Sequence, residues 1–319
     1  MKYRQLGRTA LRVSELCLGT MNFGPRTSEK DSFKILDLAL DSGINFIDTA
    51  NQYGGSLGVG TTETIIGKWL AQDKTRRDQV VLATKVHEPM SDGVNDRGLS
   101  ARHIQMACEA SLKRLGIENI DLYQMHHIDR SAPIDEIWQA LDNLVRQGKV
   151  TYTGSSNFPG WAIARANERA MSRGGLGLVA EQTLYNLLER RAELEVIPAC
   201  LEYGLGLIPW SPLAGGLLAG RPTTEGRRMA ALENASEKVK SQLGRFEQLS
   251  SGLGEPSSNV ALAWLLHQPA IASVITGPGD ANQLSEMLKV PDIELSHDVL
   301  AQIDEIFPPC GPAPEAYAW

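Results

Sequence analysis

Cysteine is scarce in this sequence: there are four in 319 residues, Cys17, Cys108, Cys200 and Cys310, and no two have the Cys-x-x-Cys spacing. Such scatter argues against a zinc site or a disulfide framework and favours reduced thiols. Long apolar runs are also missing, both the roughly 18 residues that span a bilayer and the shorter run of a signal peptide near Met1. These absences predict a cytoplasmic protein without a membrane partner.

Positive charge is in short supply as well, because 31 Lys and Arg face 38 Asp and Glu, for a formal net charge of -7. Nucleic-acid-binding proteins usually display clustered Lys and Arg, so this balance argues against a nucleic-acid partner. Hydrophobic residues make up 42% of the chain and charged residues 22%, ordinary values for a protein that buries a large core. The sequence favours a small-molecule partner and leaves open whether the chain forms a homo-oligomer.

Strand-like and helix-like segments alternate along almost the whole chain. A β-hairpin is predicted from the extended segments at residues 2–6 and 12–14, which flank Gly7-Arg8. Eight strands follow, at residues 15–20, 44–49, 79–85, 120–126, 150–157, 177–183, 204–210 and 271–276. Each precedes a predicted helix, at residues 27–43, 61–70, 100–115, 133–147, 161–173, 192–203, 257–268 and 282–289.

Eight strand-helix units indicate a closed barrel. Short, continuously apolar strands joined by helices are typical of a parallel α/β sheet, and eight units close a (β/α)8 TIM barrel. An open doubly wound sheet is disfavoured because no Gly-x-Gly-x-x-Gly follows a strand directly, and the glycines of 54–60 are interpreted as a turn. We therefore predict one domain over 1–319, with a cofactor-covering flap at 214–254, an extra helix at 296–306 and a Pro-rich tail at 307–319.

Polar or aromatic residues end six consecutive predicted strands. In a (β/α)8 barrel the carboxyl ends of the strands and the loops after them form the active face. Taken singly, each such residue has an ordinary structural role, such as a helix cap, a solvated strand end or a buried histidine, and it is their convergence that favours a site. The residues are Asp48, Lys85, His126, Ser156-Asn157, Gln182 and Trp210-Ser211, with Tyr53 on the loop after Asp48.

Four of these residues make a coherent proton donor. A phenol has a pKa of about 10, which is high for a catalytic acid at neutral pH. A lysine ammonium about 4 Å away lowers a phenol pKa by up to about three units at an effective dielectric near 20. We therefore expect Asp48 to hold Lys85, Lys85 to lower the pKa of Tyr53, and His126 to hydrogen-bond the substrate oxygen.

The stretch His126 to Asp129 offers a second interpretation, a metal site in a barrel hydrolase. Neighbouring residues on a strand point to opposite faces, so His126 and His127 are not expected to share one ion. No metal ligand is therefore assigned, and metal-dependent hydrolysis is the least favoured function.

Several motifs together resemble those of the aldo-keto reductase family. GINFIDTANQYG resembles its Asp-Thr-Ala-x-x-Tyr-Gly signature, and LATK, DLYQMH, GSSNF, EQTLYN and IPWSPLAGGLL resemble its later motifs in the same order. The resemblance covers nearly the whole chain and implies hydride transfer from NADPH to a small-molecule carbonyl substrate without a metal. It implies that Asp48, Tyr53, Lys85 and His126 are the catalytic tetrad.

The resemblance also implies a set of cofactor contacts. Ser156, Asn157 and Gln182 would bind the carboxamide, and Trp210 would face the nicotinamide ring. The contacts expected at the pyrophosphate and adenosine are Ser211, Leu213, Gly215, Leu217, Gly277, Gln283 and Glu286. Gly279 and Asp280 stand where the family usually has a basic residue for the 2'-phosphate, and Met287 replaces its asparagine. Arg221 is expected to supply the missing charge, with Arg227 and Arg228 as further candidates, so NADPH is favoured over NADH.

The resembling branch contains potassium-channel β-subunits and bacterial ketoreductases, including reductases of nucleotide-linked deoxysugars in actinomycete antibiotic biosynthesis, and the tail GPAPEAYAW is reminiscent of that last group. The leading hypothesis is a carbonyl reductase acting on such a deoxysugar or another secondary-metabolite intermediate. The alternative is a cofactor-binding regulatory subunit with slow turnover. Met21, Phe23 and His127 are the expected substrate contacts.

Overall fold

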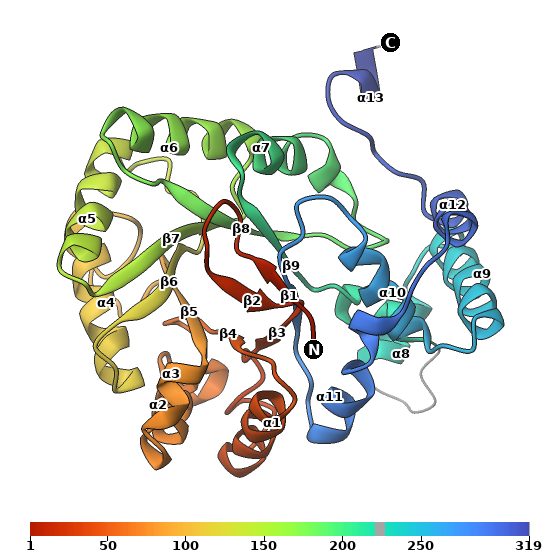
Figure 1. Ribbon diagram of the computed structural model, residues 1–319, viewed down its shortest axis with the longest axis horizontal. Helices are drawn as coiled ribbons and strands as arrows, with labels where there is room; N and C mark the ends of the chain where they lie inside the picture. The colour runs from red at the N-terminus through yellow and green to blue at the C-terminus, as the bar shows by residue number, and fades with distance from the viewer. Residues whose placement is uncertain (221–226, 319) are drawn as a thin grey trace.

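Parallel strands form a closed ring at the centre of the computed structural model, which describes residues 1–220 and 227–318 (Figure 1). In the described residues the sheet has eight strands in the order β10-β3-β4-β5-β6-β7-β8-β9. They are β3 (Leu16–Gly19), β4 (Phe46–Asp48), β5 (Val81–Val86), β6 (Ile120–Met125), β7 (Val150–Ser156), β8 (Leu178–Leu184), β9 (Gly206–Trp210) and β10 (Val274–Thr276). The ring closes because Leu207 donates its N–H to Ala270 O and accepts that of Ala272, at 2.7 and 2.9 Å. The predicted (β/α)8 barrel is confirmed.

Helices form the outer layer and follow the predicted capping signals. They are α1 (Glu29–Asp41), α2 (Thr61–Gln72), α4 (Ala101–Leu115), α5 (Ile134–Arg146), α6 (Gly160–Ser172), α7 (Val196–Tyr203), α10 (Ser257–Leu266), α11 (Ala281–Met287) and α12 (His297–Ile306). Ser28 caps α1 by accepting the Asp31 N–H, and Ser100 caps α4 by accepting the His103 N–H. Gly116 ends α4 at a φ of 66°, a left-handed conformation that glycine adopts without steric cost.

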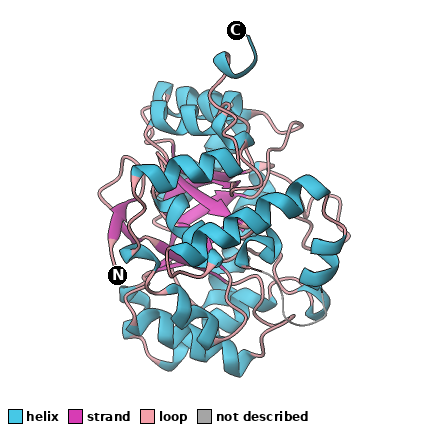
Figure 2. Cartoon of the chain, turned by 90° about the vertical axis from the view of Figure 1, so that its right-hand side faces the viewer, coloured by secondary structure: helices cyan, strands magenta, loops and turns pink. Residues whose placement is uncertain are grey.

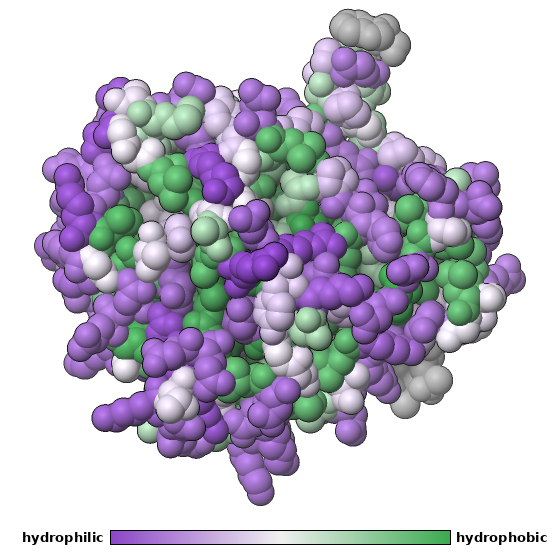
Figure 3. Space-filling view, in the orientation of Figure 1, coloured by the Kyte–Doolittle hydropathy of each residue, from purple (hydrophilic) through white to green (hydrophobic). Residues whose placement is uncertain are grey.

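The N-terminal hairpin, β1 (Tyr3–Gln5) and β2 (Arg12–Ser14), closes one end of the barrel. Leu6 and Val13 are completely buried with the apolar side chains that fill the barrel interior. Gly7 is required at the turn, because a Cβ at its φ of 57° would lie 2.4 Å from Val179 O. Hydrophilic residues gather over the centre of this closed face (Figure 3). Leu6 and Val13 pack with Phe46 and Val81, the first residues of β4 and β5, so the carboxyl ends of these strands lie at the opposite end of the barrel.

Several elements, most of them short, were not predicted. They are α3 (Thr75–Gln79), α8 (Arg227–Glu233), α9 (Glu237–Gly252), α13 (Glu315–Ala318) and the 3-10 turns η1 (Gly55–Leu57), η2 (Arg191–Glu193), η3 (Ala214–Ala219) and η4 (Val290–Asp292). The segment predicted as a flap thus contains α8 and α9, and α9 packs its buried Phe246 edge-on against Phe307 at 5.5 Å. Its covering role stays a prediction. In the described residues, no helix combines the length and apolar character needed to cross a bilayer.

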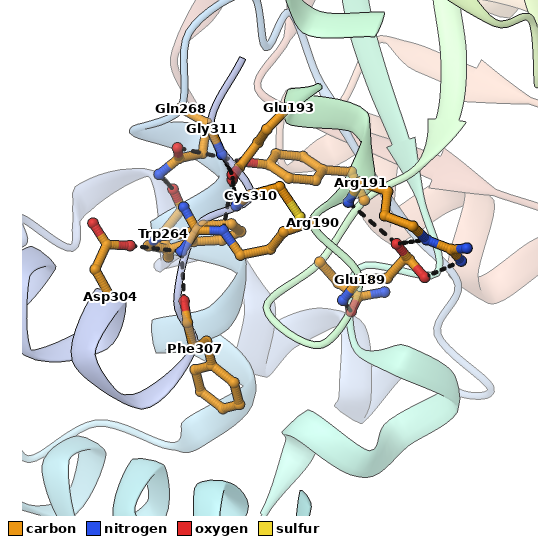
Figure 4. A network of polar contacts seen from close by, with 12 residues as sticks. Glu189, Arg190, Arg191, Glu193, Trp264, Gln268, Asp304, Phe307, Cys310 and Gly311 are labelled. Atoms are coloured by element: carbon orange, nitrogen blue, oxygen red, sulfur yellow. Dashed lines mark hydrogen bonds and ion pairs between the residues drawn. The ribbon is translucent and has the colours of Figure 1, made fainter. Parts of the chain in front are cut away.

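A buried arginine fastens the C-terminal segment to the barrel (Figure 4). Arg190, on the loop after β8, donates to Glu193 and Asp304 at 2.6 Å each and to Phe307 O at 2.7 Å. Its guanidinium also lies 5.0 Å from the Trp264 ring centroid. Glu193 accepts the backbone N–H of Cys310 at 2.8 Å, so one ion network holds both α12 and the start of the tail. Ala313 still donates its N–H to Leu194 O at 2.9 Å, and the end of the tail beyond it stands away from the body (Figure 2).

We expect Arg190→Met to lower the free energy of unfolding by about 3 kcal/mol, because it leaves the Glu193 carboxylate, whose side chain is only 11% exposed, without its cation. Arg191→Met is the matched control: its side chain is 76% exposed and pairs with Glu189 at the surface, so its loss should cost about 0.5 kcal/mol or less. Urea unfolding of both variants measures the difference. Equal losses would contradict the assigned role of the buried network.

Candidate active site

A buried ion pair joins the ends of β4 and β5 at the open end of the barrel. Lys85 Nζ donates to Asp48 Oδ2 at 2.6 Å and to Thr49 O at 2.9 Å, and both charged side chains are almost completely buried. Asp48 Oδ1 accepts from the amide groups of Gln124 and Gln182, at 3.0 and 2.8 Å. Burial on its own lowers the pKa of Lys85, but its interactions with Asp48 and Tyr53 together outweigh burial and the pKa is raised. Lys85 is therefore held as an ammonium ion.

Tyr53 lies against this ammonium group. Lys85 Nζ is 3.5 Å from Tyr53 Oη and 5.1 Å from the ring centroid, so the predicted juxtaposition is present. The expected direction of the pKa shift was wrong, however. Burial raises the pKa of Tyr53 above its ordinary value, Lys85 opposes that shift, and Asp48 adds to it. The raised pKa means that Tyr53 keeps its proton at neutral pH. The sequence predicted the effect of the lysine but not the loss of water around the phenol on folding.

His126 follows the last residue of β6 and faces Tyr53 edge-on, with ring centroids 5.9 Å apart. Burial, then the charge of Lys85, lowers the pKa of His126 to about 2, so the ring is neutral at physiological pH. Its Nδ1 atom is buried and makes no hydrogen bond within the described residues. A neutral imidazole has one N–H to donate, which suits the oxygen of a bound carbonyl group.

His127 does not point away from His126, as strand alternation had led us to expect. The two rings stack at 4.9 Å with an interplanar angle of 5°, because both residues lie beyond the end of β6. His127 Nε2 lies 3.2 Å from Glu88 Oε1, and its ring meets that of His87 edge-on at 5.5 Å. Among the described residues, no three His, Cys, Asp or Glu form a group that could hold a metal ion. This cluster lines the mouth beside His126.

The residues expected at the carboxamide are linked by hydrogen bonds. Asn157 has a left-handed φ of 58° and accepts the Trp210 indole N–H at 3.0 Å. Its amide group donates to His126 O at 3.1 Å and to Ser156 Oγ at 3.0 Å. Gln182 uses its amide N–H groups on Asp48 and Gln124, which leaves its oxygen to accept from a ligand. β6, β7, β8 and β9 thus bring these side chains to one place.

Glu181 supports this turn from the outer side of the barrel, and sequence reasoning missed it. The carboxyl group is buried and accepts from Ser155 Oγ and from the Phe158 N–H, which is 3.0 Å away. Burial raises the pKa of Glu181 to about 8. The folded protein therefore retains a proton that the unfolded chain releases near its ordinary value of about 4.3. Stability should fall as the pH rises from about 4.5 to about 8.

We expect Glu181→Gln to flatten this pH dependence, because an amide has no proton to lose. Between pH 5 and pH 8 the wild-type protein should lose on the order of 3 kcal/mol more stability than the variant. Urea unfolding at both pH values measures this. Glu168→Gln, which changes an exposed carboxylate, is the control and should behave like the wild type. Identical pH dependence in Glu181→Gln and wild type would refute the assignment.

The loop after β9 has the backbone geometry of an anion site. Ser211, Ala214, Gly215 and Gly216 have φ values of 50°, 49°, 68° and 99°. Leu213, at a φ of -102°, precedes left-handed Ala214, and such a change of hand turns successive N–H groups toward one side, an arrangement that binds phosphate. Within the described residues the N–H groups of Leu213 and Gly215 donate to no protein acceptor. The expected contacts Ser211, Leu213, Gly215 and Leu217 all lie on this loop, so the chain offers donors that fit a pyrophosphate.

The adenosine contacts expected after β10 are at the surface. Gly277 accepts the Asn22 side-chain N–H at 3.0 Å, Gln283 accepts the Gly279 N–H at 2.8 Å, and Glu286 is exposed. Asp280 caps α11 by accepting the Gln283 N–H at 2.9 Å, which gives it a structural role. Arg221 and the side chains of Arg227 and Arg228 lie outside the described residues.

Two of the three expected substrate contacts are available to a ligand. Met21 is 58% exposed on the loop after β3, and His127 lies beside His126. The prediction that Phe23 contacts the substrate was wrong, because its side chain is 0% exposed and belongs to the main core. Its backbone explains the burial: the Phe23 N–H donates to Thr20 O and its carbonyl accepts from Thr62 Oγ1, which folds the loop inward.

Sequence reasoning also missed Gln124, His87 and Glu88. Gln124 had a usable signal, since it lies two residues before His126 and residues i and i+2 of a strand share one face. His87 and Glu88 follow β5 in a loop with no recognisable motif. His87 has a φ of 153°, an unusual value for a residue other than glycine, and its carbonyl accepts the Gly98 N–H at 2.6 Å.

Comparisons with known proteins agree on one family. A sequence model of the Aldo/keto reductase family matches residues 15–307. An uncharacterized oxidoreductase of Bacillus subtilis, YrpG, is 54% identical over 326 residues that cover 100% of both chains. Versiconal hemiacetal acetate reductase of Aspergillus parasiticus is 32% identical, covering 97% of this chain and 98% of its own. A probable voltage-gated potassium channel subunit beta of Arabidopsis thaliana is also 32% identical, covering 99% and 100%.

Proposed function

This chain belongs to the aldo/keto reductase family of oxidoreductases, and from that premise we propose that it reduces an aldehyde or ketone with Tyr53 as the proton donor. The observation that carries the proposal is the position of Lys85 Nζ, 2.6 Å from Asp48 and 3.5 Å from Tyr53 Oη at the open end of the barrel. The family uses nicotinamide cofactors, and a bound nicotinamide would supply the hydride.

The side chains of this protein would supply the proton and stabilise the charge that its transfer leaves behind. Tyr53 stays protonated at neutral pH and can give its proton to the carbonyl oxygen as negative charge develops there. Lys85 stabilises the phenolate that remains, and neutral His126 donates an N–H to the same oxygen. Asp48, fixed by Gln124 and Gln182, keeps Lys85 in position.

We place NADPH ahead of NADH as the cofactor. The segment after the phosphate-binding loop carries Arg221, Arg227 and Arg228, which offer the positive charge that a 2'-phosphate requires. Direct titration of the protein with both cofactors decides this point, and a Kd for NADH equal to that for NADPH would reverse the preference.

The proposed substrate is a large carbonyl compound, a nucleotide-linked deoxysugar or another secondary-metabolite intermediate. The relative from Aspergillus parasiticus is named for the reduction of versiconal hemiacetal acetate, which supports an organic carbonyl compound as the substrate. Because the four cysteines of the chain are unpaired thiols, we place the protein in the reducing cytoplasm.

The reaction is tested by following the transfer of a labelled hydride to the product, in addition to the loss of NADPH absorbance. With NADPH deuterated at nicotinamide C4 and 2-nitrobenzaldehyde, we expect one deuterium on the carbinol carbon of the product, detected by mass spectrometry. The competing function is a cofactor-holding regulatory subunit, which the plant relative named as a potassium channel subunit beta favours. Tight NADPH retention with negligible turnover across a panel of aldehydes and ketones would support that alternative and count against a reductase.

A further inference from the structure

A cavity of about 380 Å³ opens beside the candidate active site, between the loop after β6 and the first turns of α6. We call it the Trp161 pocket; its lining includes Ile128, Arg130, Phe158, Trp161 and Arg165. Ile128 directly follows His127, and Phe158 directly follows Asn157, so the pocket begins one residue beyond the mouth on two neighbouring strands. Its volume is within the range of small-molecule sites.

The pocket presents an aromatic surface to solvent. Trp161 is 48% exposed, whereas Phe158 behind it is only 4% exposed. The guanidinium carbon of Arg130 lies 5.8 Å from the centroid of the Trp161 ring. A half-exposed indole beside a buried phenyl ring is suited to stacking on a planar aromatic group of a ligand.

The pocket lining also carries more positive than negative charge, because Arg130 and Arg165 face a single carboxylate there. Arg169 on α6 pairs with Asp135, and Arg173, the residue that caps the end of α6, pairs with Asp142. In contrast, within residues 1–220 and 227–318 neither Arg130 nor Arg165 makes an ion pair with a carboxylate.

The one acid in the pocket lining is already engaged. Asp129 accepts hydrogen bonds from the backbone N–H groups of Leu99 and Ser131, at 2.9 Å each, and from the Ser131 hydroxyl. Asp129 stays ionised, so the guanidinium groups of Arg130 and Arg165 exceed the negative charge of the lining by one, and a guanidinium binds phosphate in a bidentate manner.

The position of the pocket distinguishes it from the expected cofactor site. The loops expected to hold the pyrophosphate and adenosine follow β9 and β10, and β10 lies four strands from β6 in the sheet order. A ligand in the Trp161 pocket approaches the mouth past His127 and Asn157, which contact each other at 3.3 Å. The pocket is thus placed to hold a part of the substrate remote from the carbonyl group.

We infer that the Trp161 pocket binds an aromatic ring joined to a diphosphate group, the chemistry of a nucleoside diphosphate carried by the substrate. The inference rests on the proposed function, since it assigns the remote part of the carbonyl substrate. Trp161 stacks on the base, and Arg130 and Arg165 hold the phosphates. Binding energy gained there serves the reaction by fixing the carbonyl group near Tyr53.

Isothermal titration of the full chain with UDP, under saturating NADP⁺, tests the pocket while the cofactor site is filled. We expect UDP to bind with a Kd below about 1 mM, and uridine alone or inorganic diphosphate alone to bind at least tenfold more weakly. Trp161→Ala and Arg165→Met should each raise the Kd for UDP at least tenfold, while Trp161→Phe, which keeps a stacking ring, should raise it less. Arg169→Met, one turn along the same helix, should leave it within about twofold.

Failure of UDP to bind the NADP⁺-loaded wild type would overturn the inference. A wild-type Kd for UDP in the Trp161→Ala and Arg165→Met variants would overturn it as well. UDP that binds only when NADP⁺ is absent occupies the cofactor site and also counts against it. Reduction of 2-nitrobenzaldehyde by the wild type is measured in parallel. A protein that binds UDP in the pocket but transfers no hydride would disprove the proposed function alone.

Discussion

Replacing Tyr53 by phenylalanine is expected to lower kcat for carbonyl reduction by a factor of about 10³, within the 10²–10⁴ that a positioned proton donor supplies. The variant loses only the hydroxyl, so its ring can keep the edge-on contact with His126. Lys85 retains its bonds to Asp48 and Thr49 O, and no buried charge loses its partner. The Kd for NADPH should therefore stay within about twofold.

Steady-state turnover and fluorescence titration of NADPH separate these two effects. Tyr203→Phe is the matched control, because its hydroxyl is at the surface and donates to Glu168 at 2.9 Å. That variant should keep wild-type turnover. If Tyr53→Phe turned substrate over at the wild-type rate, the proton donor would have to be sought elsewhere, whereas loss of NADPH binding would indicate that the hydroxyl holds the cofactor.

The alternation of strands and helices carried most of the fold prediction. Helix starts at Ser28 and Ser100 and the stop at Gly116 were readable because each acts through its own backbone neighbours. The helix α9 was missed because its sequence has a weak apolar face, with only Phe246 and Ser250 buried. Its packing against Phe307 depends on a residue about 60 positions away in the chain, which no local pattern contains.

The convergence of the proposed catalytic residues could be predicted for a geometric reason, and their pKa values could not. Parallel strands of a barrel place their carboxyl ends at one mouth, so Asp48, Lys85 and His126 had to converge once the strands were recognised. The pKa of Tyr53 depends on how much water the folded chain removes, which is a tertiary property. The same limit explains the wrong prediction for Phe23, because the turn of its loop places the side chain in the core and not in the substrate pocket.

Replacing Lys85 by methionine is expected to damage both stability and turnover. Asp48 would remain buried without its cation, a loss of about 3 kcal/mol or more in the free energy of unfolding. The sign of the catalytic effect follows from the pKa of Tyr53. Lys85 is the influence that lowers this pKa, while burial and Asp48 raise it, so the variant would have a still weaker acid. We expect kcat to fall at least about 100-fold.

A double variant, Lys85→Met with Asp48→Asn, separates the two consequences. It removes the unpaired charge, so urea unfolding should show stability partly restored relative to Lys85→Met, a non-additive result expected for residues in contact. Turnover should stay low, because no cation faces Tyr53 to stabilise the phenolate that proton transfer leaves behind. Recovery of turnover together with stability would mean that Lys85 serves only to neutralise Asp48, and that the acidity of Tyr53 does not depend on the ammonium group 3.5 Å away.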